Sequence, residues 1–183
     1  MSEELDVLKL VCQRLENSNI SYMLTGSLAS NFYAVPRMTR DIDIVIELLN
    51  IEVPRFYGVF HDEFYIDKAM ILEAIKHQDM FNIIHNTTVL KIDFVIRKES
   101  PYRHIEFQRK KSVDLDGIKI WIVSPEDLII SKLVWVKDAE SDYQLRDVKN
   151  LLASTKNLDM EYIEKWVHKL ELNSAYEKAK LNG

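Results

Sequence analysis

The chain has 183 residues, of which 47% are hydrophobic and 29% charged, so it is long enough to bury one sizeable core. Its formal net charge of −5 argues against a protein whose whole surface binds nucleic acid, because such binding depends on cations that neutralise phosphates. Its single cysteine excludes an internal disulfide, and no apolar run reaches the roughly 20 residues that span a bilayer. Because the N-terminal segment is also acidic, we expect a soluble, cytoplasmic protein without a membrane partner.

Helical and strand periodicities alternate through the first half of the chain. They predict, in order, a helix over residues 3–17, a strand over 20–24, a helix over 27–33, a strand over 41–48, and helices over 53–60 and 67–76. Pro54 suits the first turn of its helix, and Asp67 is the expected cap of the next one.

The second half begins with two predicted hairpins and continues as helices. The hairpins join strands over 80–85 and 89–96, and over 111–115 and 118–123, the second through Asp116-Gly117. After a Ser124-Pro125 helix start, helices are predicted over 128–136, 140–153, 159–170 and 173–181. The expected fold class is α/β (α+β), with a mixed β-sheet flanked by helices in residues 1–123 and a C-terminal helical segment, residues 124–183, packed on it.

Two carboxylates begin the strand predicted over 41–48. Side chains two residues apart on a strand share a face, so Asp41 and Asp43 project together. Such a pair repels unless it is solvated, shares a proton or holds a cation, and Mg²⁺ prefers oxygen ligands. Upstream, Gly26 and Ser27 open a helix whose first N–H groups, with the Ser27 hydroxyl, suit a phosphate or cap the helix. The two features predict a site for a metal-chelated triphosphate; the alternative for the acids is a solvated strand edge.

This order of a Gly-Ser turn, a short helix and an Asp-x-Asp strand resembles the nucleotidyltransferase superfamily, which has the DNA polymerase beta-like fold. That family has a third carboxylate on a later, neighbouring strand, and Asp93 in LKIDFVI matches it. The resemblance implies that Asp41, Asp43 and Asp93 are catalytic and hold two Mg²⁺ ions, with Mn²⁺ as a substitute. It also implies that Asp93 helps to deprotonate the acceptor, whereas its alternative role is that of a strand residue paired with Lys91 or with a neighbour in the hairpin.

Residues on either side of this core resemble one small bacterial branch of the superfamily, which contains abortive-infection-type nucleotidyltransferase toxins. Thr39-Arg40 before the first acid and Pro125-Glu126-Asp127-Leu128 at the start of a helix carry this resemblance.

In that branch a helical lysine and a later Arg/Lys-Asp pair follow, and Lys132 and Arg146-Asp147 match them. Lys132 is therefore a candidate nucleotide-binding residue beside Gly26 and Ser27. Its alternative is a stem along the core with the ammonium in water. For Arg146 and Asp147 we expect an intramolecular ion pair, and for Trp135 a core or interface position.

The function that follows is transfer of a nucleoside monophosphate from a nucleoside triphosphate, such as ATP, to a hydroxyl with release of pyrophosphate. The acceptor stays open between an RNA 3′ end such as that of tRNA, a protein side chain and a small molecule. Basic residues in the segment 97–111, which reads as a loop and strand edge, slightly favour RNA, and the acidic total slightly favours the other two. The alternatives are a non-catalytic nucleotide- or partner-binding module, such as a toxin-antitoxin component with an antitoxin partner, and a metal-dependent hydrolase.

Overall fold

The computed structural model describes residues 3–39 and 41–180, and in these residues seven strands form one sheet in the order β3-β4-β5-β2-β1-β7-β6. The strands are β1 Tyr22–Thr25, β2 Asp41–Ile46, β3 Phe64–Tyr65, β4 Met80–His85, β5 Lys91–Ile96, β6 Lys111–Leu115 and β7 Ile118–Ile122. The helices are α1 Glu3–Asn17, α2 Gly26–Ser30, the 3-10 helix η1 Asn50–Glu52, α3 Val53–Phe60, α4 Lys68–His77, α5 Pro101–Gln108, α6 Pro125–Ala139, α7 Asp142–Ser154, α8 Met160–Lys169 and α9 Asn173–Lys180.

The sheet is mixed, as the sequence predicts. Strand β2 runs parallel to β5, and β1 runs parallel to β7. The pairs β1–β2, β3–β4, β4–β5 and β6–β7 are antiparallel, so both expected hairpins are present. The centre of the sheet is therefore β5-β2-β1, where the strands that carry the candidate acids lie side by side.

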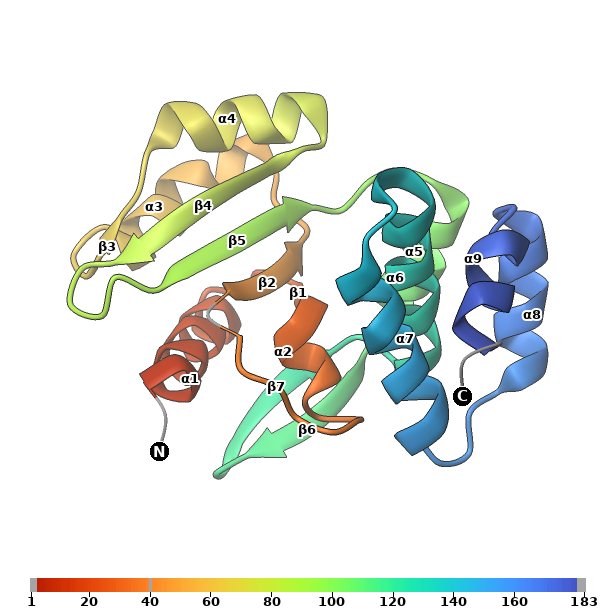
Figure 1. The fold of residues 1–183 in the computed structure, drawn as a ribbon. Coiled ribbons are helices and arrows are strands. Elements are labelled where there is room, and N and C mark those ends of the chain that lie inside the picture. The colour runs from red at the N-terminus through yellow and green to blue at the C-terminus, as the bar shows by residue number, and fades with distance from the viewer. Residues whose placement is uncertain (1–2, 40, 181–183) are drawn as a thin grey trace.

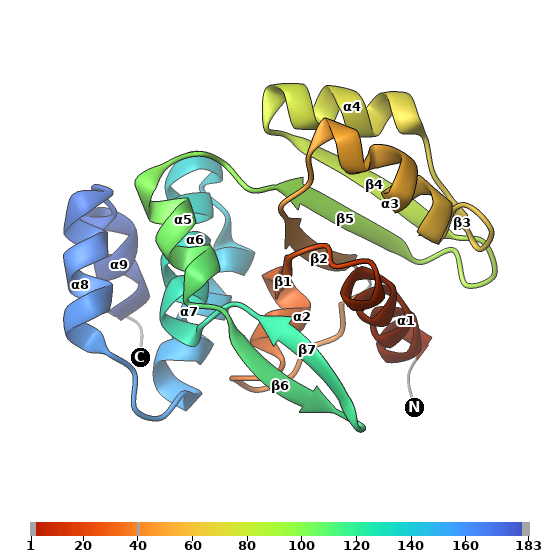
Figure 2. The ribbon, with the colours of Figure 1, turned by 180° about the vertical axis from the view of Figure 1, so that it is seen from behind.

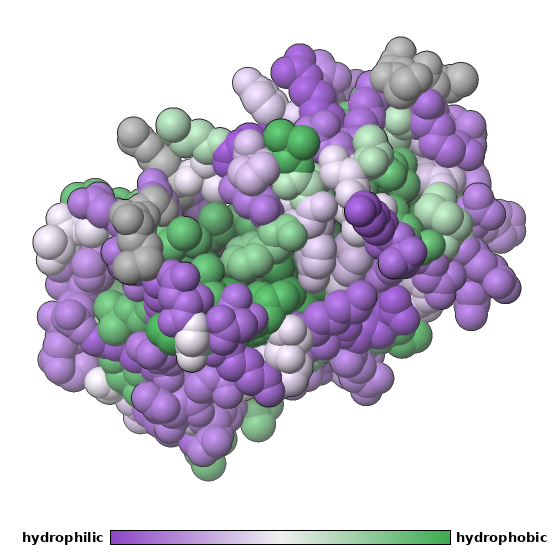
Figure 3. Space-filling view, turned by 90° about the horizontal axis from the view of Figure 1, so that it is seen from below, coloured by the Kyte–Doolittle hydropathy of each residue, from purple (hydrophilic) through white to green (hydrophobic). Residues whose placement is uncertain are grey.

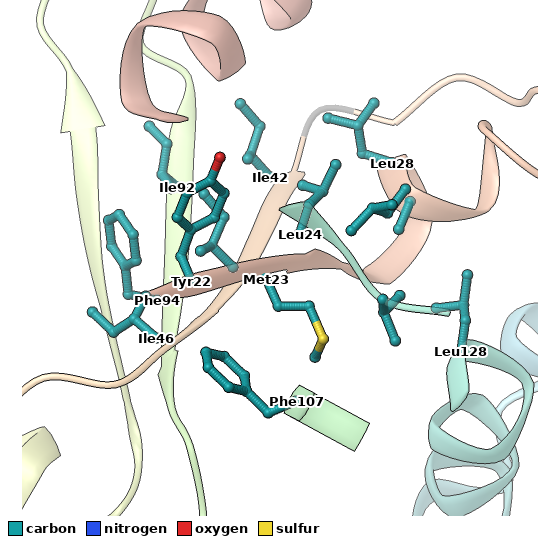
Figure 4. Packing of buried hydrophobic residues seen from close by; sticks show 14 of the residues in the cluster. Tyr22, Met23, Leu24, Leu28, Ile42, Ile46, Ile92, Phe94, Phe107 and Leu128 are labelled. Atoms are coloured by element: carbon teal, nitrogen blue, oxygen red, sulfur yellow. The ribbon is translucent and has the colours of Figure 1, made fainter. Parts of the chain in front are cut away.

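Helices cover both faces of this sheet. Figure 2 shows α1 and α3 on one face, and Figure 1 shows α2 and α6 on the other. Alternation along β1 supplies both layers: in Figure 4 Tyr22 lies beside Ile92, whereas Met23 points the other way, toward Phe107 of α5. Because each face has its own apolar layer, a polar site at the centre must interrupt one of them.

The segment 97–111 differs most from expectation. Residues 101–108 form α5, which starts with Ser100 as cap, its hydroxyl accepting a hydrogen bond from the Arg103 N–H, and with Pro101 in the first turn. Tyr102 of α5 packs on Trp166 of α8, with ring centroids 4.9 Å apart. The prediction of a loop and strand edge is wrong here, because the helix-start signal at Ser100-Pro101 outweighs the basic composition.

Smaller differences concern the ends of elements. Helix α2 ends at Ser30 and not at residue 33, and β5 begins at Lys91 and not at residue 89. The elements β3 and η1 were not predicted, and Leu181, the expected end of the last helix, lies outside the described residues. None of these differences changes the order of the predicted elements.

Buried apolar residues from both halves of the chain belong to one core cluster. The helices α5–α9 stand together at one end of the sheet (Figures 1 and 2). We keep the division near residue 123 as a proposal, with the later helices packed against the sheet half. Within residues 3–39 and 41–180, every helix is too short or too polar to cross a membrane.

Four phenylalanine rings pack together under β4 and β5, and Phe56 of α3 is at their centre. Its ring centroid lies 4.8 Å from that of Phe60, 5.6 Å from that of Phe81 and 5.2 Å from that of Phe94. We expect Phe56→Ala to lower the free energy of unfolding by about 3–5 kcal/mol, because it removes buried apolar area and leaves a cavity. Denaturant unfolding followed by circular dichroism measures this, with exposed Tyr65→Ala as control, expected within about 0.5 kcal/mol of wild type. A loss of under about 1 kcal/mol in Phe56→Ala would contradict the assignment of this cluster to the core.

Candidate active site

Asp41 and Asp43 begin β2 and project from the face that lies toward α6. Asp41 is exposed and Asp43 is half-buried, whereas their neighbours Ile42 and Ile44 are buried on the opposite face. The two carboxylates therefore share one face, as the alternation along a strand predicts.

Asp93 lies on the neighbouring strand, directly beside Asp43. The parallel pairing of β2 with β5 aligns Asp43 with Asp93 and Asp41 with Lys91. The Asp93 side chain is buried, and its Oδ2 lies 2.7 Å from the Lys91 ammonium. Its Oδ1 is buried without a hydrogen-bond partner among the residues that the structure describes. Asp93 is thus both a neighbour of the Asp-x-Asp pair and the ion-pair partner of Lys91.

The crowding of carboxylates changes the protonation of this site. Burial, followed by the charges of Asp93 and Asp41, raises the pKa of Asp43 to about 6. The hydrogen bond to Asp93, with the charges of all three acids, raises the pKa of Lys91, so its ammonium is held in the charged form. In the described residues, no group of three or more His, Cys, Asp or Glu side chains is already arranged around a metal position. The acids are adjacent but are not gathered on one point.

Gly26 packs against the Asp43 carboxylate. Its φ of +68° lies in the left-handed region, and a Cβ at this position would overlap the Asp43 side chain. Glycine is required here because the turn between β1 and α2 passes so close to the acid.

Ser27 does not cap α2, because the helix begins at Gly26 and its N-cap residue is Thr25. The Ser27 hydroxyl instead accepts a hydrogen bond from the Arg37 guanidinium. The expected role of Ser27 as a cap is therefore wrong, and the hydroxyl lies beside a cation. The helix itself has only five residues, which limits what its N-terminus contributes to binding an anion.

Lys132 of α6 points toward the acids and is buried. Its ammonium donates hydrogen bonds to Asp147 Oδ2, 2.7 Å away, and to Gln144 Oε1, 2.9 Å away, both on α7. Burial lowers the pKa of Lys132, although Asp147 partly offsets this. The alternative of an ammonium in water is wrong, because the amine is held by α7.

A cavity of about 280 Å³ brings most of the predicted residues together. It is lined by Thr25, Gly26, Ser27, Asp41, Asp43, Val95, Leu128, Ser131, Lys132, Trp135 and Gln144. An adjoining, mostly apolar cavity of about 310 Å³ shares Thr25, Val95, Ser131 and Trp135 with it. Asp93, which is buried beside Asp43, is not among the lining residues of either cavity.

Sequence reasoning missed several residues at this site. Trp135 is not in the core: it is 60% exposed, at the rim of both cavities. Asp147 is in an ion pair as expected, but with Arg37 and Lys132, while the Arg146 guanidinium lies over the Tyr143 ring. One signal in the sequence relates two of these residues. Lys132 and Trp135 are three residues apart, so on a helix their side chains lie next to each other on the same face.

Arg37 and its neighbours in the loop line a third cavity. This open, apolar space of about 770 Å³ lies between α1, α2 and Leu115 of the β6–β7 hairpin. Figure 3, which views the molecule from below, shows a hydrophobic hollow in green with hydrophilic surface around it. Arg40 of the expected Thr39-Arg40 pair lies outside the described residues.

Three solved structures illustrate the similarity in fold. An antigenic nucleotidyltransferase-like protein from Paracoccidioides brasiliensis has a TM-score of 0.61 at 18% identity, over 97% of this chain and 94% of that chain. The antibiotic-resistance factor ANT(2″)-Ia has 0.58 at 10% identity, over 95% and 94%. The lincomycin-bound lincosamide antibiotic adenylyltransferase LnuA has 0.53 at 12% identity, over 84% and 98%. At these identities the likeness shows the fold alone.

No curated protein sequence matches the chain. A protein family does: it is described as nucleotidyltransferase of unknown function (DUF6036), and the match covers residues 5–182. The resemblance to the nucleotidyltransferase superfamily is confirmed by this match and by the fold, whereas the abortive-infection branch stays a prediction. The chain therefore belongs to this family of nucleotidyltransferases.

Proposed function

We propose that this protein is a Mg²⁺-dependent nucleotidyltransferase, which transfers a nucleoside monophosphate from a nucleoside triphosphate to a hydroxyl and releases pyrophosphate. The observation that carries the proposal is one cavity with two kinds of wall. Asp41 and Asp43 form the acidic wall, and Ser27 with Lys132 forms a wall suited to phosphate. A metal-chelated triphosphate needs both charges within a few ångströms.

The residues at the acidic wall suit a hard divalent cation. All three acids offer oxygen, one buried oxygen of Asp93 lacks a hydrogen-bond partner among the described residues, and the pKa of Asp43 is raised by its neighbours. A cation between them would relieve the repulsion that raises this pKa. When bound, Mg²⁺ or Mn²⁺ would neutralise phosphate charge and lower the pKa of the acceptor hydroxyl.

We assign roles by position. Asp41 and Asp43 would hold the metal ions, and Asp93 would join them once Lys91 releases its carboxylate. Asp93 would also help to take the acceptor proton. Ser27 and Lys132 bind phosphate, and Gly26 keeps the Asp43 carboxylate accessible by carrying no side chain.

The exposed ring of Trp135 supports a place for the nucleoside. The ring lies where the acidic cavity meets the apolar one. The base of a nucleotide whose phosphates are bound in the acidic cavity can therefore stack on this ring. ATP is one candidate nucleotide, and the base itself is not assigned.

For the acceptor we favour a small molecule. LnuA is an antibiotic adenylyltransferase with lincomycin bound, and a structure of ANT(2″)-Ia is in complex with adenylyl-2″-tobramycin. The support that the basic segment lent to RNA is weaker than the sequence suggests. Arg97 pairs with Glu47 and Glu99, and Arg109 pairs with Asp127, so these charges are already partly neutralised. An RNA 3′ end and a protein side chain are the alternative acceptors, and the labelling experiment below distinguishes them from a small molecule.

Two observations favour a second function, a non-catalytic nucleotide- or partner-binding module, with an antitoxin as one type of partner. Lys91 occupies Asp93, and the described carboxylates do not converge on a metal position. A protein that kept Lys91 in place would bind nucleotide without transferring it.

The direct test uses α-labelled ATP, CTP, GTP and UTP with Mg²⁺, the purified protein, and separate RNA, protein and small-molecule fractions. We expect label on one fraction with wild type and at least a ~100-fold slower transfer with Asp41→Asn, because this change replaces a charged metal ligand by a neutral amide. The exposed position of Asp41 predicts an almost unchanged thermal midpoint. Label as free monophosphate would indicate a hydrolase, and nucleotide binding with no transfer to any fraction would indicate the binding module.

The raised pKa of Asp43 predicts how stability depends on pH. Its pKa rises from an ordinary 3.8 to about 6, so between these values the native state holds a proton that the unfolded chain has lost. Metal-free protein therefore loses stability as the pH rises through this window and does not regain it above. We expect Asp43→Asn to raise the free energy of unfolding at pH 7 by about 3 kcal/mol and to change it little at pH 4.

Urea unfolding at the two pH values in the presence of a chelator measures this difference. Exposed Asp138→Asn is the control, and it should change the free energy of unfolding by less than about 0.5 kcal/mol at either pH. Mg²⁺ should stabilise wild type more than Asp43→Asn. Equal pH dependence in wild type and Asp43→Asn would show that the acids do not repel as the geometry indicates.

A further inference from the structure

Arg37 reaches from the loop between α2 and β2 to the wall of the candidate active site. Its Nε lies 2.9 Å from Asp147 Oδ1 and its Nη2 lies 3.0 Å from Asp147 Oδ2, so the carboxylate of α7 is held by two parallel hydrogen bonds. The same Nη2 donates to the Ser27 hydroxyl. One guanidinium thus joins the helical layer to the turn that the sequence marks for phosphate.

Asp147 holds a second cation at the same time. Lys132 Nζ lies 2.7 Å from Asp147 Oδ2, the oxygen that also accepts from Arg37. The Asp147 side chain is 5% exposed and that of Lys132 is 3% exposed, whereas that of Arg37 is 39% exposed. Because two cations share one buried anion, the group of Arg37, Lys132 and Asp147 carries an excess positive charge. This charge is accessible to solvent on the side of Arg37 and Ser27.

Ser27 adds a hydrogen-bond donor beside this excess charge. A hydroxyl has one proton to donate, and Ser27 uses its oxygen to accept from Arg37. Its proton is therefore left to donate. Ser27 and Lys132 line the cavity, and Arg37, which is not among its lining residues, reaches the edge of the cavity through its hydrogen bond to Ser27. The hydroxyl, the ammonium and the guanidinium all suit phosphate oxygens.

We propose that Arg37 binds the β- and γ-phosphates of the nucleotide, and that Asp147 is a positioning residue that aims Arg37 and Lys132 at them. This inference rests on the proposed function and adds a ligand that the Gly-Ser and Asp-x-Asp pattern does not include. A simple structural ion pair needs one cation for Asp147. A second cation on Asp147, and the contact of Arg37 with Ser27, are explained by an anion that arrives from the cavity.

The proposal predicts that the effect of Arg37 depends on the number of phosphates. Arg37→Gln keeps a polar side chain but removes the charge and the fork of N–H donors. We expect it to weaken binding of ATP and of inorganic pyrophosphate about 10- to 100-fold, the range for hydrogen bonds to charged groups, and binding of AMP less than about 3-fold. Arg37→Lys should fall between wild type and Arg37→Gln, because it keeps the charge and loses the fork.

Isothermal titration of ATP, AMP and pyrophosphate, each with Mg²⁺, measures these affinities. Arg146→Gln is the matched control, because it removes an exposed arginine next to Asp147 that lies over the Tyr143 ring. Its affinities should equal those of wild type. Equal loss of AMP and ATP affinity in Arg37→Gln, or no loss of either in a folded variant, overturns the proposal. If Arg37→Gln does not fold, protection of Arg37 in wild type from phenylglyoxal by pyrophosphate, with Arg146 unprotected, decides it.

Asp147→Asn separates positioning from charge. Loss of a negative charge near the phosphates should by itself tighten ATP binding. If Asp147 aims the two cations, ATP affinity falls instead, and the difference between ATP and AMP shrinks. A tighter complex overturns the positioning role.

Failure of the inference and failure of the proposed function look different. Unchanged ATP binding in Arg37→Gln, with normal transfer of label, refutes the role of Arg37 and leaves the nucleotidyltransferase intact. Pyrophosphate binding that depends on Arg37, in a protein that transfers no nucleotide, supports the phosphate site and refutes the transferase.

Discussion

The parallel pairing of β2 with β5 is the constraint on which the site depends. Aligned residues of neighbouring strands lie roughly 5 Å apart, so the register that pairs Asp43 with Asp93 forces two carboxylates together. The hydrophobic pattern sets this register. Ile42 and Ile44 must be buried with Ile92 and Phe94 on the α1–α3 face, and a slip by one residue would place the acids in that core. Folding the apolar face thus assembles the acidic one, although the acids repel.

Cations on two different elements balance this repulsion, and an anion on a third element holds one of them in place. Lys91 on β5 pairs with Asp93, Lys132 on α6 acts on Asp43 across the cavity, and Asp147 on α7 holds Lys132 in place. Burial alone would raise the pKa of Asp147, but the hydrogen bonds from Arg37 and Lys132 lower it, so it stays charged. The site therefore has its negative charges on the sheet and its positive charge on the facing helices, on two walls of one cavity. A metal-bound triphosphate, with cations toward the acids and phosphates toward the bases, matches this separation.

The sequence predicts the local parts of this arrangement and misses the distant ones. The order of strands and helices, the shared face of Asp41 and Asp43, and the glycine at position 26 all follow from spacing over a few residues. The sequence does not predict helix α5, although Ser100-Pro101 is the same start signal as Ser124-Pro125, because a run of basic residues is more typical of a solvated loop. The contact of Arg37 with Asp147 spans 110 residues, and no local periodicity encodes which surface two helices and a loop will share.

The position of Lys132 depends in turn on how the start of α6 is held. Asp127, fully buried in the first turn, accepts hydrogen bonds from Ser124, from Arg109 after α5 and from Tyr162 of α8, at 2.7, 2.9 and 2.7 Å. An unpaired buried carboxylate would be costly, so these three partners fix the helix axis by fixing Asp127. Five residues later along the same helix, Lys132 then faces the acids and not solvent. The helical layer is therefore part of the candidate site, because it places the Lys132 ammonium opposite the acids of the sheet.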